Sequence, residues 1–150
     1  LDKAELSDDF FISFESLLKI GNRAELVLDS YIQRTNEIHN FKVEIFNFLL
    51  DFIKNRDLDH VLVPYLYHTD FITRARTIFE LEEAGDKRYV KFIIPLINDP
   101  DDSVRWAVIR FLDTHNLAKN PLIYTELKNI IEKESNPVIK EKIKEVLKSA

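Results

Sequence analysis

The stretch FIIPLINDPDDSVRWAVIRFL, residues 92–112, holds a proline inside an apolar segment, an acidic turn, and the pair Val104-Arg105 shortly after the turn. Apolar residues recur at intervals of three and four on both sides of the turn, which is the spacing of helices that bury one face. The turn is short, so two helices joined by it must lie antiparallel. The stretch therefore predicts a helical hairpin.

Parts of this hairpin occur again in the chain. A shift of 31 residues toward the N-terminus aligns three unlike residues with identical ones: Pro95 with Pro64, Asp101 with Asp70, and Arg105 with Arg74. One residue inserted at the turn aligns the core positions better at an offset of 32, so both registers stay open. A weaker copy lies 35 residues later, where Ile139, Lys140, Val146 and Leu147 match Val104, Arg105, Phe111 and Leu112. Repeated two-helix units of this length are typical of a solenoid.

Glycine and proline are scarce, with two glycines and five prolines in 150 residues. Such a chain has little material for β-hairpin turns, so we predict an all-α fold. Gly21 and Gly85 predict helix ends, and Asn120-Pro121 and Asn136-Pro137 predict helix starts. These signals divide the chain into nine expected helical segments: 7–20, 22–35, 38–55, 57–68, 70–84, 87–98, 101–115, 121–134 and 136–149.

The hairpin resembles a HEAT repeat. The resemblance rests on proline in the first helix, aspartate at the turn, and a Val-Arg pair followed by small and apolar residues in the second helix: Pro95, Asp99, Asp101, Val104, Arg105, Ala107 and Leu112. It covers residues 57–149 and is closest over 87–116, whereas 1–56 is predicted to hold less regular helices. The resemblance implies a short right-handed superhelix of about nine helices. The length and apolar content fit a single domain over 1–150. Because the first residue is Leu1 and not Met, we expect either a domain excised from a larger protein or a processed product.

The same resemblance implies a function. HEAT-like modules present their second helices to partners, so we expect a non-catalytic interaction or scaffolding module that binds a protein or peptide segment. Trp106, Ile109, Arg110 and Asp113 share a helix face away from the predicted core, and Trp and Arg are enriched among binding hot spots. We take these four residues as the candidate binding surface, together with the equivalent positions one unit earlier, Ile78 and Phe79. Packing of Trp106 against the next repeat remains an equal alternative.

Charged residues also recur at the start of each second helix. Arg74, Arg105 and Lys140 each follow a polar turn residue by four positions: Asp70, Asp101 and Asn136. That spacing places donor and acceptor on one helix face, and the resemblance implies a ladder of such pairs along the stack. We interpret these six residues as structural rather than as a phosphate or carboxylate site.

The N-terminal segment carries a surplus of apolar side chains. The run FFISFESLLKI, residues 10–20, is apolar around much of its circumference, whereas a terminal helix of a solenoid usually has a polar outer face. We therefore expect Phe10, Phe11 and Phe14 to contact a neighbouring domain or a second copy of the chain.

Composition argues against several other functions. The formal charge is −5, and residues 1–30 alone carry seven acids against three bases, so a nucleic-acid partner is not expected. The chain has no cysteine and no histidine pair with metal-ligand spacing, so we expect no metal and no cofactor. The longest apolar run, 61–67, is far shorter than the ~20 residues of a membrane helix. We expect a soluble, cytoplasmic protein without membrane contact.

No local motif predicts catalysis, because the chain lacks Gly-x-Ser-x-Gly and any phosphate-binding glycine loop. We therefore do not expect an enzyme. One alternative stays open, since the pattern also resembles HEAT-like alkylpurine DNA glycosylases, which bind DNA in a basic concave groove. That alternative requires a local basic stripe, for which the chain offers Arg74, Arg76, Arg105 and Arg110.

Overall fold

In the computed structural model, residues 6–20 and 62–150 are described. These two ranges contain only helices: α1 (Asp8–Ile20), α4 (Val63–Leu66), α5 (Phe71–Ala84), α6 (Val90–Ile93), the 3₁₀ helix η3 (Ile94–Asn98), α7 (Asp102–Thr114), the 3₁₀ helix η4 (Leu117–Lys119), α8 (Pro121–Ile131) and α9 (Pro137–Ser149). The predicted all-helical fold is confirmed for this part of the chain. The expected segments 22–35 and 38–55, and the first five residues of 57–68, lie outside the described residues.

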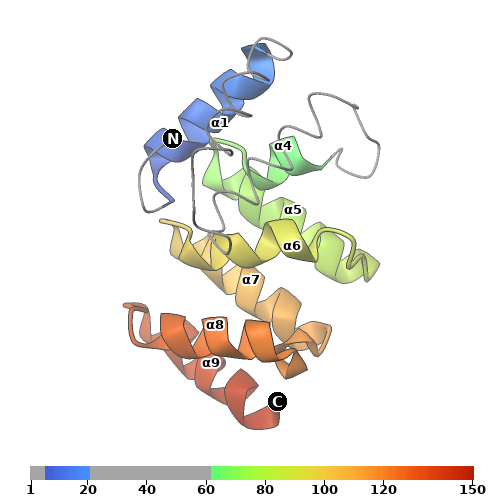
Figure 1. The fold of residues 1–150 in the computed structure, drawn as a ribbon, viewed down its shortest axis with the longest axis vertical. Helices are drawn as coiled ribbons and strands as arrows, with labels where there is room; N and C mark the ends of the chain where they lie inside the picture. The colour runs from blue at the N-terminus through green and yellow to red at the C-terminus, as the bar shows by residue number, and fades with distance from the viewer. Residues whose placement is uncertain (1–5, 21–61) are drawn as a thin grey trace.

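Three hairpins follow one another along the molecule (Figure 1). The first pairs α4 with α5, the second pairs α6 and η3 with α7, and the third pairs α8 with α9. The second helices lie side by side, because α7 contacts both α5 and α9. Helix α1 lies beyond α4 at the opposite end of the stack from α9 (Figure 1). This arrangement gives the molecule one layer of first helices and one layer of second helices.

Polar side chains start the helices at the expected places. The carboxylates of Asp70 and Asp101 accept the backbone N–H two residues later, at the beginnings of α5 and α7. Asn120 and Asn136 do the same ahead of Pro121 and Pro137, which confirms both predicted helix starts. The first residues of α5 and α7 are 31 positions apart, so the register at the turn is 31 and not 32.

Backbone constraints explain where other helices stop or change. Gly85 has a φ of 66° and ends α5, as predicted, because glycine adopts the left-handed conformation without steric cost. The predicted helix 87–98 is instead divided into α6 and η3. Pro95 lies in η3, and a proline lacks the N–H and collides with the carbonyl four residues earlier. Gly21 lies outside the described residues.

The hydrophobic core runs between the two layers of helices. Helix α7 contributes most to it, with Val104, Ala107, Val108, Ile109, Phe111 and Leu112 at no more than 1 % exposure. A helix that is flanked on two sides by other second helices and covered by the first-helix layer must bury more than one stripe. The exposed face of α7 is therefore narrower than the sequence suggests.

The aromatic residues of α1 belong to the same core. Phe10, Phe11 and Phe14 are 2 %, 0 % and 0 % exposed. The ring of Phe14 lies 5.2 Å from that of Tyr67 at the end of α4. The prediction that these three phenylalanines contact a second copy or another domain is wrong, because their apolar surface is already covered within the chain.

Candidate functional site

A buried ion pair joins the first two hairpins. Arg74 on α5 donates from Nε to Oδ2 of Asp99 at 2.9 Å and from Nη2 to Oδ1 at 3.0 Å. Its Nη1 donates to the carbonyl oxygens of His68 and Thr69. Both charged side chains are almost fully buried, and burial raises the pKa of Asp99 above its ordinary range although Arg74 opposes the shift.

The same arrangement joins the second and third hairpins. Arg105 on α7 donates from Nε and Nη2 to the two carboxylate oxygens of Glu134, at 2.9 and 3.0 Å. Its Nη1 donates to the carbonyl oxygens of Asp99 and Pro100. Each arginine therefore binds the turn of its own hairpin and a carboxylate in the turn of the next.

This geometry corrects the predicted ladder. The pairs Asp70–Arg74 and Asp101–Arg105 were expected to be ion pairs within one helix, but both aspartates cap their helices instead. Asn136 also caps its helix and donates from its side chain to Asp102 on α7. The ladder therefore runs between hairpins.

Asp99 and Glu134 are the acids that the predicted ladder missed. Each precedes a capping residue by two positions and accepts that residue's backbone N–H, at 2.9 Å from Asp101 and 3.0 Å from Asn136. His68 takes the same place in the first hairpin, where its Nδ1 accepts the backbone N–H of Asp70 at 3.0 Å. The acid two residues before the capping residues Asp101 and Asn136 is visible in the sequence and could have identified both partners. Lys140, the third expected cation, has no ion-pair partner among the described residues.

The predicted binding surface is only partly exposed. Ile109 and Ile78 are 0 % exposed, so the expectation that they contact a partner is wrong. Helical periodicity placed Ile109 off the predicted core stripe, and Ile78 was included as its equivalent one hairpin earlier, but both side chains belong to the hydrophobic core. Trp106 is half-buried and packs against the core. It is therefore neither a fully exposed binding residue nor a fully buried core residue.

The remaining candidate residues take part in contacts between second helices. The Arg110 guanidinium lies 3.6 Å from the Glu82 carboxylate and 5.7 Å from the centre of the Phe79 ring. Asp113 accepts from Nζ of Lys142 on α9 at 2.9 Å, and this hydrogen bond raises the pKa of Lys142. Arg110 and Asp113 are exposed enough for a partner to reach, but neither is an isolated charge.

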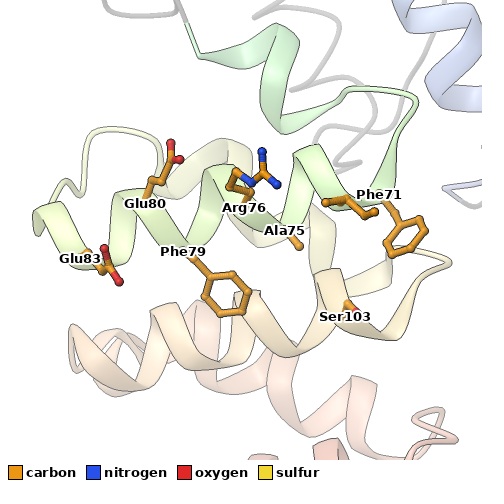
Figure 2. A pocket seen from close by; sticks show the side chains of 8 residues that line it. Phe71, Ala75, Arg76, Phe79, Glu80, Glu83 and Ser103 are labelled. Carbon is orange, nitrogen blue, oxygen red and sulfur yellow. The ribbon is translucent and has the colours of Figure 1, made fainter.

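A groove of about 440 Å³ lies on the same layer, one hairpin nearer the N-terminus. Its apolar lining comes from Phe71, Ile72, Ala75 and Phe79 on α5, and Ser103 on α7 contributes the facing side (Figure 2). Phe71 and Ile72 are large apolar residues, yet they are 41 % and 50 % exposed. Of the predicted surface residues, only Phe79 lines this groove.

Three charged side chains complete the lining of the groove: Arg76, Glu80 and Glu83. Figure 2 shows Arg76 and Glu80 on the side of α5 away from α7, and Glu83 at the end of α5 opposite Phe71. Neither glutamate forms an ion pair with another described residue. The groove thus has an apolar end near Phe71 and an acidic end near Glu83.

The arginines do not form the basic stripe that the DNA-binding alternative requires. Arg74 is 1 % exposed and paired with Asp99, Arg105 is paired with Glu134, and Arg110 lies beside Glu82. Arg76 is exposed but shares its groove with two glutamates. These four arginines, all in the described part of the chain, therefore form no continuous positive path for a phosphate backbone.

Residues 6–20 and 62–150 contain no group of three or more His, Cys, Asp or Glu side chains placed to hold a metal ion. In these two ranges, no helix combines the length and the apolar character needed to cross a membrane.

The stacked hairpins and the ion pairs between them define a helical repeat protein. The sequence model of the HEAT-repeat family matches residues 60–148, which is more than half of the chain. The chain therefore belongs to the HEAT-repeat family, as the resemblance indicated. Comparisons with curated proteins and with solved structures found no match. HEAT repeats typically mediate protein–protein interactions and are generally non-catalytic scaffolds.

Proposed function

We propose that this protein is a non-catalytic interaction module that binds a segment of a partner protein on the layer formed by α5, α7 and α9. The observation that carries the proposal is the exposure of Phe71 and Ile72 at 41 % and 50 % beside a groove on this layer. Exposed apolar side chains in a concave site favour burial by a partner, because each Å² of apolar surface removed from water contributes about 25 cal/mol.

The charged residues of this layer suit a polar rim. Arg110 and Asp113 lie on α7 next to the groove-lining helix, and both remain partly exposed, at 47 % and 38 % of their side chains. Interfaces commonly surround an apolar centre with charged residues of this kind, which set orientation more than affinity. We place the apolar centre at the groove and the rim at Arg110 and Asp113.

The proposal includes the architecture that the family implies. Short connections at 85–89 and 115–120 link the three hairpins in sequence. They join the hairpins over 63–149 without a long linker, and we propose that 1–150 forms one domain in which a right-handed superhelix aligns the second helices into one surface. The binding function requires only that α5, α7 and α9 remain adjacent.

Affinity capture with surface variants tests this function. The wild-type protein and Phe71→Ser are immobilised and exposed to a native extract, and Leu122→Ser serves as the control. Leu122 is an exposed apolar residue on α8 in the first-helix layer, so its replacement removes an apolar side chain away from the groove. We expect proteins that are retained by the wild type and the control but lost by Phe71→Ser. Retention of the same proteins by all three would contradict a site on the second-helix layer.

A further inference from the structure

We infer that the partner segment carries one apolar side chain with a lysine or arginine three to four residues away, and that it docks as an extended strand along the groove between α5 and α7. This inference rests on the proposed function and specifies the chemistry of its partner. It follows from three features of the groove, which are its small floor residues, its two aromatic rings and its acidic end.

The floor and the walls form a notch for a single side chain. Ala75 on α5 and Ser103 on α7 are the two smallest residues of the lining, and they lie between the rings of Phe71 and Phe79 (Figure 2). A partner's leucine or phenylalanine placed there would contact both rings and cover part of the exposed surface of Phe71. Aromatic walls around a small floor are the arrangement in which one apolar anchor dominates binding.

The notch depends on the side chains at these positions and not on the repeat fold as such. With the 31-residue register of the helix starts, Ala75 is equivalent to Trp106 in the next hairpin. Trp106 packs its large side chain against the core, where α5 has only a methyl group. Phe79 is likewise equivalent to Arg110. The first of these two hairpins therefore presents an apolar notch at a place where the second presents an indole and a cation.

The charge of the groove selects the neighbouring residue of the partner. Glu82 is already held by Thr114 and Arg110, whereas Glu80 and Glu83 form no ion pair with a described residue. Two glutamates against one arginine leave the lining acidic, and the whole chain has a net charge of −5. A cationic segment is therefore favoured both on approach and in the bound state.

Helix geometry sets the spacing between anchor and cation. Ala75 and Glu83 are eight residues apart on α5, which corresponds to about 12 Å at ~1.5 Å per residue. An extended peptide advances ~3.3 Å per residue, so it covers this distance in about three to four residues. A lysine or arginine at that distance from the anchor reaches Glu83.

Fluorescence anisotropy with a defined probe tests the inference. The probe is a short labelled Gly/Ser peptide with a central leucine and lysines three and four residues to either side, since the direction of binding is left free. Two matched peptides replace the leucine by serine, or the lysines by glutamates. The wild-type protein should bind the probe and bind both replacements at least about five-fold more weakly.

Two protein variants address the notch and the acidic end separately. Ser103→Phe fills the notch from an exposed position and keeps the backbone N–H of residue 103, which donates to the capping carboxylate of Asp101. Glu83→Lys reverses the acidic end, and Glu126→Lys on α8 is its matched control, because Glu126 is also an exposed helical glutamate. We expect Ser103→Phe to weaken the probe about ten-fold and Glu83→Lys about five-fold, with no change for Glu126→Lys.

Several outcomes overturn the inference. Equal binding of the lysine and glutamate peptides overturns it, as does equal binding by Glu83→Lys and Glu126→Lys. Wild-type protein that self-associates and becomes monomeric in Ser103→Phe would show that a second copy fills the notch. If Ser103→Phe does not fold, the two charge variants and the matched peptides still decide the result. Loss of captured proteins by Phe71→Ser without any probe binding would overturn this inference alone and leave the proposed function standing.

Discussion

The Arg74 guanidinium donates two hydrogen bonds, of 2.9 and 3.0 Å, to the Asp99 carboxylate, although the two residues are 25 positions apart and belong to different hairpins. The guanidinium carbon of Arg74 lies 3.8 Å from the centre of the Phe11 ring. One buried charge pair thus ties α1, the first hairpin and the second hairpin together. Arg105 and Glu134 repeat the relationship one hairpin later with slightly more exposure.

Loss of the Arg74 cation should strongly destabilise the fold. Arg74→Met leaves the Asp99 carboxylate buried without its partner, so we expect the free energy of unfolding to fall by about 3–5 kcal/mol. Urea denaturation followed by circular dichroism measures this change. Lys144→Ala is the control, because the Lys144–Glu141 pair is exposed and should contribute less than about 1 kcal/mol. Similar losses in both variants would show that the buried pair has no special weight.

The Arg74→Met defect should also depend on pH. Burial raises the pKa of Asp99, and removal of the opposing arginine raises it further above its unfolded value of about 3.9. A carboxyl whose pKa is raised by folding stabilises the fold when protonated, and that contribution disappears as pH rises through the folded pKa. The difference between Arg74→Met and wild type should therefore be smaller at pH 5 than at pH 8. A pH-independent difference in urea midpoints would contradict this mechanism.

The third cation of the series should matter less than the second. Arg105→Ala removes two hydrogen bonds to a nearly buried carboxylate and should cost about 2–3 kcal/mol. Lys140→Ala removes a cation that pairs with no described residue, so its effect should stay within about 0.5 kcal/mol. Thermal unfolding of both variants compares them directly. Equal losses would mean that Lys140 has a partner of comparable strength.

Trp106 should contribute to the stability of the fold as well as to any binding surface. Its indole is half-buried against the core, so Trp106→Ala should lower the free energy of unfolding by about 2 kcal/mol, less than for a fully buried aromatic residue. Trp106→Phe keeps most of the packing and should lose less than half as much. Chemical denaturation of the two variants makes the comparison, and an unchanged stability in Trp106→Ala would place the indole entirely at the surface.

Duplex DNA should not bind. Three of the four arginines proposed for a basic stripe face carboxylates, and the fourth shares its groove with two glutamates. Electrostatic affinity for a phosphate backbone is greatest at low ionic strength, so a gel-shift assay in low salt is the most sensitive measurement. A salt-sensitive shift that Arg76→Glu abolishes would restore the DNA-binding alternative.

The local signals in the sequence were sufficient for the starts of α5, α7, α8 and α9 and for the end of α5. Asp70, Asp101, Asn120 and Asn136 act on backbone groups two or three residues away, so their effect can be read from neighbouring positions alone. Gly85 ends α5 through its own φ angle, which is likewise a local property of the chain. Repetition of these signals at 31 and 35 residues was enough to predict stacked hairpins, because each amphipathic unit needs a neighbour to cover its apolar face.

The site was less accessible to sequence reasoning. Periodicity assigned one buried stripe to α7, but a helix with neighbours on two sides buries a second, so Ile109 was mistaken for a surface residue. The groove needs Phe71 from the start of one helix and Ser103 from the start of another, and their proximity depends on how α5 lies against α7. No spacing within either helix encodes that approach.

The sequence alone was therefore enough for the repeat, the helix starts and the family, because these arise from interactions between residues close in the chain. Partner choice among the charges and the exposure of each apolar residue depended on the packed fold. Arg74 lies four residues from Asp70 and 25 from Asp99. Packing nevertheless places the Asp99 carboxylate where Arg74 donates two hydrogen bonds to it, whereas the Asp70 carboxylate caps its own helix.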